Sequence, residues 1–364
     1  LNEDSEEVII MKNTTIKVFL SSVFLIGALS AGTIKSQGQA GATQLLIPVG
    51  ALSIATSGAN GATVLGVDAL YLNPAGIAGF IGGFQGTAST MSYIGNIDIS
   101  NAGFVTNLGA SGSFGISVKS LDFGDIPVTT AQATEGTGEM FSPNFQTVTA
   151  TYAKSFAEGV RFGVSLKLVS EQIVNTKANG TAIDMGVQYR FANYPLAIGV
   201  TLSNLGNRME YEGSDLEQTL TPSESQSGSS VERFRVKSEA FDLPAKLNVS
   251  LNYAAMDGLN LMWAFTNNSF SANTQSFAAK YSFGPAWVAG GMESRLVGDS
   301  KPSEISKDNW SEAESEAKNN LFGATFGAGV TVPVGGMNIG ISYSMRSLAR
   351  YFESNQVMQL SVEF

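Results

Sequence analysis

Apolar and polar residues alternate along most of the chain after residue 82. In residues 160–168 (VRFGVSLKL) every second side chain is apolar, and Arg, Gly, Ser and Lys occupy the positions between. The same period recurs at 183–191, 247–253 and 337–345. A period of two over about ten residues predicts a strand with one apolar face and one polar face. The chain is therefore predicted to be all-β.

The pattern predicts fourteen strands whose connections are alternately short and mostly longer. Every second connection is a tight turn, whereas three of the others are long, at 122–143, 206–241 and 296–320. Short turns at one end and long loops at the other are typical of outer-membrane barrels. The predicted strands are 83–93, 101–109, 113–121, 144–156, 160–174, 181–192, 196–205, 242–255, 259–267, 274–283, 286–295, 321–332, 336–346 and 355–364.

Two architectures accommodate such strands. A soluble sandwich buries the apolar faces between two sheets, whereas an outer-membrane barrel turns them toward lipid. Charged residues make up 14% of the chain, against about a quarter in a typical soluble domain. The last strand also alternates and ends on the aromatic Phe364. These features favour a transmembrane antiparallel β-barrel, residues 83–364, in the outer membrane of a Gram-negative bacterium.

The N-terminal residues resemble a targeting segment. A basic start at Met11 and Lys12 precedes the apolar run 18–29, and small residues follow it. We expect a secretory signal peptide at 11–31, with cleavage after Ala31 or as late as Ala40; the alternative is a membrane anchor. Residues 1–10 are acidic, the wrong charge to precede a signal. We therefore expect them not to belong to the native protein.

Missing residue types exclude several chemistries. The chain has no Cys and no His, which removes thiol nucleophiles, disulfides, Ser-His-Asp triads and the commonest metal ligand. No pair of carboxylates is marked by its spacing. We therefore expect no enzyme activity, no cofactor and no metal site. The net charge of −10 disfavours nucleic acid as a partner.

Residues 41–82 do not alternate cleanly and are too apolar for a tail in water. In an eight-strand barrel, side chains alone can fill the lumen. A fourteen-strand barrel is wider, so its lumen needs a further segment to fill it. We therefore expect this segment to fill the lumen as a hatch. Asn73 is suited to cap a short helix, and Pro74 suits its first position. Asp68 is a candidate partner for an inward cation.

The hatch carries the most specific resemblance. The run DALYLNPAG, with Asp68, Tyr71 and the Asn73-Pro74-Ala75-Gly76 turn, resembles the N-terminal signature of PorV/PorQ outer-membrane proteins, small relatives of the FadL transporters. The resemblance continues as a fourteen-strand plan to Phe364. The chain departs from the signature at Leu52, Thr56, Ser57 and Leu72, where the family commonly has Arg, Met, Gly and Trp.

This resemblance implies two functions from different classes. PorV-type proteins act in type IX secretion, where they dock exported proteins at the outer face for surface attachment. FadL-type proteins are channels that move hydrophobic small molecules, such as fatty acids, past the hatch. Whether the hatch is a fixed plug or a moving gate stays open in either case.

Inward positions of the predicted strands carry more cations than acids. One interpretation is that these cations pair with the hatch, with inward loops or with water. The other is that some of them hold an anionic amphiphile beside an apolar pocket. The inward acids are Asp184 and Glu363, and the inward cations are Lys119, Arg161, Lys167, Arg190, Lys246, Lys280 and Arg346.

The long loops are acidic, and the simplest interpretation is that they form solvated surface. The stretch 306–320 (SKDNWSEAESEAKNN) places Trp310 among polar residues. An indole left in water suggests a contact with a partner. Trp310 is therefore the candidate outer-loop contact for exported proteins or secretion machinery.

Overall fold

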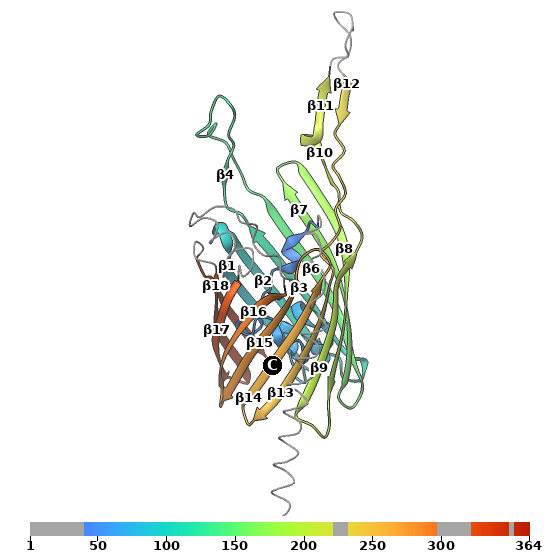
Figure 1. Cartoon of the computed structure of the whole chain (residues 1–364), viewed down its shortest axis with the longest axis vertical. Coiled ribbons are helices and arrows are strands. Elements are labelled where there is room, and N and C mark those ends of the chain that lie inside the picture. Colours follow the sequence, from blue (N-terminus) through green and yellow to red (C-terminus); the bar gives the residue numbers. More distant parts are fainter. Residues whose placement is uncertain (1–39, 221–231, 297–321, 349–352) are drawn as a thin grey trace, which may run out of the picture.

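The computed structural model describes residues 40–220, 232–296, 322–348 and 353–364. In these ranges fourteen antiparallel strands form a closed barrel, which confirms the predicted fold (Figure 1). The wall strands are β1 (Phe84–Ser92), β2 (Asp98–Asn107), β3 (Ser113–Asp122), β6 (Asn144–Ala157), β7 (Val160–Ile173), β8 (Thr176–Arg190), β9 (Leu196–Gly206), β13 (Lys246–Met256), β14 (Leu259–Asn268), β15 (Asn273–Phe283), β16 (Ala286–Leu296), β17 (Phe322–Val334), β18 (Met337–Leu348) and β19 (Asn355–Glu363).

The first and last wall strands close the barrel. β1 pairs with β19, with Met91 opposite Val357, and each other wall strand pairs with the wall strands before and after it in the chain. Closure leaves no strand edge with unpaired amide and carbonyl groups, which is the condition for a sheet to stand in lipid.

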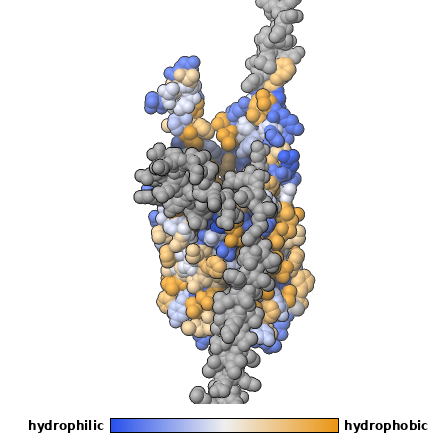
Figure 2. All heavy atoms as spheres, in the orientation of Figure 1, coloured by the Kyte–Doolittle hydropathy of each residue, from blue (hydrophilic) through white to orange (hydrophobic). Residues whose placement is uncertain are grey.

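The apolar faces of the strands point outward. On β7, Phe162, Leu166 and Leu168 are 37%, 49% and 53% exposed, while Ser165 and Lys167 between them are buried. The space-filling view shows apolar residues over much of the barrel wall (Figure 2). A sandwich would bury these side chains between sheets, so the sandwich alternative is wrong.

The two ends of the barrel differ as the connections predicted. The six predicted tight turns lie at one end, here called the inner end, and the long connections lie at the outer end (Figure 1). The outer end also has one two-residue turn, residues 174–175 between β7 and β8, where the sequence predicted a longer connection. One long connection contains the short strands β4 (Ile126–Pro127) and β5 (Met140–Phe141). Another contains β10 (Tyr211–Gly213), β11 (Glu217–Leu220) and β12 (Glu232–Arg235), and β10 extends the sheet from β8.

Aromatic pairs mark the outer surface of the wall at the inner end. Phe84 stacks on Phe104 with ring centroids 5.9 Å apart, and Tyr281 stacks on Phe283 at 5.9 Å. Rings in this position are typical of the interfacial belts of membrane barrels.

Residues 41–82, the hatch, run through the barrel from the outer end to the inner end (Figure 1). At the outer end Gly41 N donates to Asp242 O (3.1 Å), and at the inner end Gly83 N donates to Phe364 O (3.0 Å). The hatch contains short α-helices and 3-10 helices (η): η1 (Thr43–Leu46), α2 (Ala51–Ala55), η2 (Ala59–Ala62), η3 (Gly66–Asp68), α3 (Ala69–Leu72) and η4 (Pro74–Gly79).

None of the helices in the described ranges has the length and apolar character needed to cross a membrane. The predicted signal peptide, residues 1–10 and the loop that carries Trp310 lie outside the described residues.

Candidate functional site

The motif Asn73-Pro74-Ala75-Gly76 forms the start of η4. Asn73 Oδ1 accepts a hydrogen bond from Ala75 N at 3.2 Å, and Pro74 occupies the first helical position. A side-chain cap satisfies an otherwise unpaired amide, and proline presets the backbone angle of the first turn. The expected Asn-capped, Pro-initiated turn is confirmed.

This turn lies directly on the backbone of the wall. Gly163 of β7 and Gly186 of β8 are register partners. A Cβ atom on Gly186 would lie 2.1 Å from Asn73 Oδ1, and one on Gly163 would lie 2.4 Å from the carbonyl carbon of Pro74. Side chains at these two positions would therefore displace the turn. We call this pair the glycine seat.

Polar side chains fasten the hatch on the same flank. Asn73 Nδ2 donates to Gly61 O (3.0 Å) and to Val187 O (3.1 Å). Gln188 Nε2 donates to Gly61 O (3.0 Å) and Val64 O (2.9 Å). Two buried amide side chains thus bind two carbonyls of the hatch and one of β8. Here the hatch is bound to β7 and β8 without intervening space.

Asp68 and Tyr71 hold other parts of the hatch. Asp68 Oδ1 accepts from Gln359 Nε2 (2.9 Å), and Gln359 Oε1 accepts from Ala51 N (2.6 Å). Asp68 forms no ion pair among the described residues, so its partner is this amide rather than the expected cation. Tyr71 Oη lies above Gly103, 2.8 Å from where a Cβ would stand. Burial raises the pKa of Asp68 and of Tyr71.

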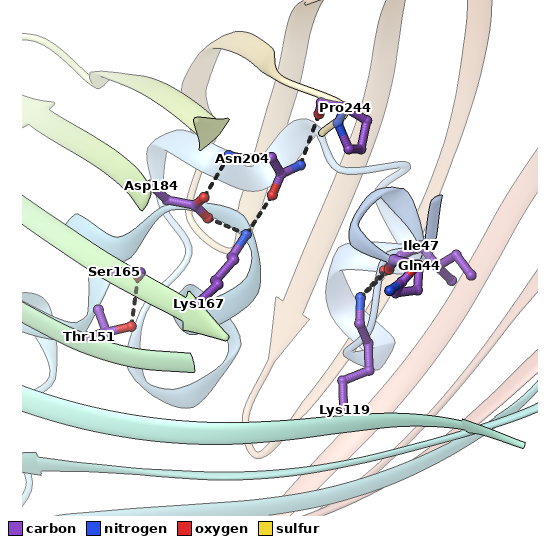
Figure 3. Close-up of polar contacts among 9 residues, drawn as sticks. All are labelled: Gln44, Ile47, Lys119, Thr151, Ser165, Lys167, Asp184, Asn204 and Pro244. Atoms are coloured by element: carbon purple, nitrogen blue, oxygen red, sulfur yellow. Dashed lines mark hydrogen bonds and ion pairs between the residues drawn. The ribbon is translucent and has the colours of Figure 1, made fainter. Parts of the chain in front are cut away.

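Two inward lysines are engaged inside the protein (Figure 3). Lys167 Nζ lies 2.5 Å from Asp184 Oδ2 and donates to Asn204 Oδ1 at 2.8 Å. Lys119 Nζ donates to the hatch carbonyls of Gln44 (2.6 Å) and Ile47 (3.1 Å). Lys119 thus ties the outer part of the hatch to β3, as the first interpretation of the lumen cations expects.

The remaining candidate cations divide into two groups. Arg161 donates to Gln188 Oε1 at 3.3 Å, and Arg346 lies 3.5 Å from Glu293 and stacks on Phe322. Lys246 occupies an inward position at the start of β13 and is half-buried. Arg190 and Lys280 line a cavity at the inner end. The structure does not bring the seven inward cations of the sequence together at one site.

That cavity, here called the inner cavity, has a volume of about 560 Å³. It lies between the hatch and the wall near the β8–β9 turn, and residues of η2 and β13–β15 also line it. A smaller polar cavity of about 140 Å³ shares Leu52, Leu65 and Asp68 with it. On this flank the hatch does not fill the lumen.

Two apolar clusters hold the outer part of the hatch. The hatch residues Val49, Ala51 and Ile54 pack with wall residues of β1, β2, β3 and β19. A second cluster joins Ala42 and Leu45 to β7, β8 and the long connection after β9. The outer part of the hatch is therefore held by apolar packing as well as by Lys119, whereas the inner cavity has a mixed lining.

Sequence reasoning missed the glycine seat, Gln188 and Gln359. Gly163 and Gly186 occupy polar-face positions of their strands, so their inward orientation is readable from the alternation. Their pairing requires the register of β7 against β8, and their contact with Pro74 requires the path of the hatch. Neither is encoded in a local pattern.

In the part of the chain that the structure describes, no three acidic residues come together in an arrangement that could hold a metal ion. No protein-family model matches the sequence, and a search of curated proteins finds no match. Solved structures do match.

The Ralstonia pickettii toluene transporter TbuX superposes with a TM-score of 0.55 at 13% identity, over 87% of this chain and 98% of that one. The barrel has the fold of such channels. The Pseudomonas putida toluene transporter TodX gives 0.52 at 12% identity over 85% and 96% of the two chains, and the monoaromatic hydrocarbon channel CymD gives 0.51 at 11% over 87% and 97%.

At these identities the likeness concerns the fold. The likeness confirms the predicted outer-membrane barrel fold. These structures give no support to a PorV/PorQ identity or to a secretion role.

Proposed function

We propose that this protein is an outer-membrane channel that passes hydrophobic small molecules and that its hatch blocks free diffusion of water-soluble ones. The observation that carries the proposal is the occupied lumen: the hatch seals one flank against β7 and β8, and its outer part packs into apolar clusters. A general porin needs an open aqueous lumen, which this barrel lacks along the hatch.

The exterior supports the location. Apolar side chains face outward along the strands, charged residues are few, and aromatic pairs stand at the inner end. These features suit a barrel with lipid on its outer surface. The barrel fold is shared with channels whose names specify toluene and monoaromatic hydrocarbons, which supports a hydrophobic cargo.

The hatch residues have distinct roles in this proposal. Asn73 and Pro74 fix the turn on the glycine seat, and Ala75 and Gly76 keep it small enough to fit. Lys119 and Arg161 hold the hatch or its neighbours in place, as does Asp68 through Gln359. Their charges therefore serve the hatch rather than a ligand.

The secretion alternative lacks an observation of its own. Its candidate contact, Trp310, lies outside the described residues, and nothing in the described ranges marks a docking surface for exported proteins. The PorV/PorQ-type role stays a prediction from the resemblance.

Uptake by whole cells tests the proposal. Cells that produce the protein in the outer membrane should accumulate radiolabelled toluene faster than cells carrying an empty vector. Entry of a hydrophilic trisaccharide should be the same in both. Equal toluene uptake, or a parallel rise of both solutes, would contradict a channel for hydrophobic compounds.

A further inference from the structure

A groove runs along β1 and β2 on the outward surface of the wall, the surface that faces lipid. Its volume is about 620 Å³. Four register partners on adjacent strands form its cross-section: Ala88 and Ala102 are the floor, and Leu360 and Val118 are the sides. The two sides are three strand spacings apart, about 14 Å, and only methyl groups lie between them. The groove is therefore wide enough to hold an extended hydrocarbon chain.

The groove exists because β1 and β2 carry small residues where other wall strands carry large ones. The outward positions next to the floor are Gly86 and Thr90 on β1 and Ser100 on β2. The sides are exposed side chains, Val118 at 42% and Leu360 at 49%. A hollow that no atom fills loses dispersion contacts along its lining. In a membrane, the neighbouring lipid chains supply these contacts.

Three hydroxyl groups border the groove on its outer side. Thr90, Ser100 and Ser120 are register partners, all line the groove, and each lies two residues from the outer end of its strand. In the described ranges none of these hydroxyls has a hydrogen-bond partner. A hydroxyl that faces lipid is stabilised when it donates to a carbonyl oxygen. The groove thus offers hydrogen-bond donors at the level where an acyl chain joins its headgroup.

Two carboxylates stand beyond the hydroxyls, at the outer ends of β2 and β3. Asp98 and Asp122 are register partners, and both side chains are exposed. Asp98 Oδ1 accepts from Ser92 Oγ at 3.4 Å, and Asp122 Oδ1 accepts from Gly124 N at 2.9 Å. Neither carboxylate takes part in an ion pair among the described residues. Like charges directly opposite each other destabilise a sheet, so a cationic group placed here would relieve the repulsion.

We propose that this groove binds a membrane lipid whose headgroup carries an ammonium group, such as phosphatidylethanolamine. Its acyl chain lies on the alanine floor, the carbonyl oxygen of its ester accepts from the hydroxyl row, and its ammonium group lies at Asp98 and Asp122. The order of these groups along the lipid is the order of the three rows on the wall. The inference goes beyond the proposed channel, because it concerns the outer surface of the barrel.

Other occupants complement the groove less well. A lipid with an anionic headgroup would bring a further negative charge to Asp98 and Asp122. A second copy of the chain would bring no cation, because the outward positions of β1, β2, β3, β18 and β19 carry no Lys or Arg. A neutral hydrocarbon would leave the hydroxyls and the carboxylates unpaired. The ammonium lipid is the occupant that meets all three rows.

Photo-crosslinking with two lipid probes tests the proposal. Both probes carry the same diazirine in the acyl chain, and their headgroups are phosphatidylethanolamine and phosphatidylglycerol. The full chain is reconstituted in vesicles of equal parts of these two lipids with a trace of one probe, and labelled peptides are identified by mass spectrometry. The ethanolamine probe should label residues 86–102 about fivefold more than the glycerol probe, the effect of one exposed charge pair. Residues 160–168 of β7 should be labelled equally by both.

Two sets of variants separate the chain from the headgroup. Ala102→Leu fills the floor and should reduce labelling of the groove by both probes at least fivefold. Its matched control, Ala328→Leu, lies outward on β17 outside the groove and should leave labelling unchanged. Asp98→Asn combined with Asp122→Asn should lower the preference for the ethanolamine probe to less than twofold. Asp257→Asn, at an exposed turn of the inner end, should preserve that preference.

A third variant tests the hydroxyl row. Thr90→Val combined with Ser100→Ala should reduce labelling by both probes about fivefold, because the ester loses its donors. Ser170→Ala on β7 is the control and should have no effect. If a variant does not fold, salt gives a second measurement on the unmodified protein. Raising ionic strength from about 0.15 M to about 1 M shortens the Debye length from about 8 Å to about 3 Å, which should reduce the ethanolamine preference while the groove stays labelled.

Three results would overturn the assignment. The first is equal labelling of residues 86–102 by both probes, or labelling that Ala102→Leu does not change. The second is labelling by the glycerol probe that exceeds that of the ethanolamine probe and disappears with EDTA, since the carboxylates would then hold a phosphate through a divalent cation. The third is a dimer in sedimentation that Ala102→Leu dissociates, which would identify a second copy as the occupant.

Toluene uptake keeps this test apart from the proposed function. If Ala102→Leu cells take up toluene normally while labelling of the groove is lost, the lipid site and the channel both stand. If labelling follows the expected pattern while toluene uptake never exceeds that of empty-vector cells, the lipid site stands and the channel is wrong.

Discussion

The two flanks of the hatch make opposite kinds of contact with the same barrel. Against β7 and β8, the Asn73 turn lies on Gly163 and Gly186 and two amides bind its carbonyls. Between the hatch and β13–β15 lies the inner cavity. One segment is therefore fastened on one flank and exposed to a cavity on the other.

The difference follows from the inward side chains of the wall. On β7 and β8 glycine lets the two backbones approach, because no Cβ separates them. On β13–β15 the inward positions near the inner end carry Asn252, Asn260, Met262 and Lys280, whose longer side chains keep the wall away from the hatch. A barrier and a cavity can thus share one lumen, provided that only one flank is filled.

A side chain added at the glycine seat should have the largest effect on the difference between the two flanks. Gly186→Ala places a methyl group 2.1 Å from Asn73 Oδ1 and should cost about 1–3 kcal/mol of stability through overpacking. It should also raise ion conductance in planar bilayers, because the seal is displaced. The matched control is Gly290→Ala on the lipid side, where the nearest atom is 3.4 Å away. Equal melting temperatures for the two variants would show that the close contact at the glycine seat does not contribute to stability.

A pair of asparagine variants compares the flanks directly. Asn73→Ala removes the cap and the bonds to Gly61 O and Val187 O, and should cost about 2 kcal/mol in thermal unfolding. Asn60→Ala, on the hollow flank, removes one long bond to Ser53 Oγ (3.4 Å) and an acceptor without a partner. We expect it to cost less than half as much. A larger loss of stability for Asn60→Ala than for Asn73→Ala would show that the hatch is held mainly on the flank that faces the inner cavity.

Pro74→Ala distinguishes a fixed plug from a gate. The substitution increases the freedom of the unfolded chain, and we expect a loss of about 1 kcal/mol or less with unchanged conductance. That result would identify Pro74 as a structural residue. A barrel of normal stability with raised conductance would instead identify the turn as a hinge.

Asp68→Asn gives the smallest effect and one that depends on pH. The pKa of Asp68 is raised by burial above its ordinary value of 3.8, so the folded barrel holds this proton more tightly than the unfolded chain does. Its contribution to stability is fully present below pH 3.8 and is lost as pH rises through the folded pKa. The Asn variant should therefore be the more stable at neutral pH, and the gap should close in acid. Asp257→Asn, at an exposed turn, is the matched control for the substitution itself.

The wall could be read from the sequence because lipid outside and a polar lumen inside impose a period of two on every strand. The boundaries moved where that constraint ends. β8 starts at Thr176 rather than 181, since its first residues extend beyond the apolar band and pair with β10. β13 starts at Lys246 rather than 242, after Pro244, which has no amide hydrogen for a ladder bond.

The candidate site was less predictable. The Asn73-Pro74 turn has a local signature and was expected, but Gln188, Gln359 and the glycine seat act through contacts between distant segments. Asn73 and Val187, for example, are 114 residues apart in the chain and 3.1 Å apart in space. The division of the cations has the same origin: Arg161 lies opposite Gln188 and Arg190 follows two residues farther along β8, and their different surroundings depend on the path of the hatch.

The pairing of β1 with β19, here called the seam, constrains the order in which the barrel is assembled. The hatch precedes β1 directly and ends beside the last residue, Phe364. The first strand therefore cannot meet the last until the whole wall has been synthesised, and by then the plug must already be enclosed or be threaded in afterwards. Because the native chain has no cysteine, a pair placed at the opposed positions Ala88 and Leu360 would record when the seam forms. Protease protection of the hatch before that cross-link appears would show that the hatch is already enclosed when β1 and β19 pair.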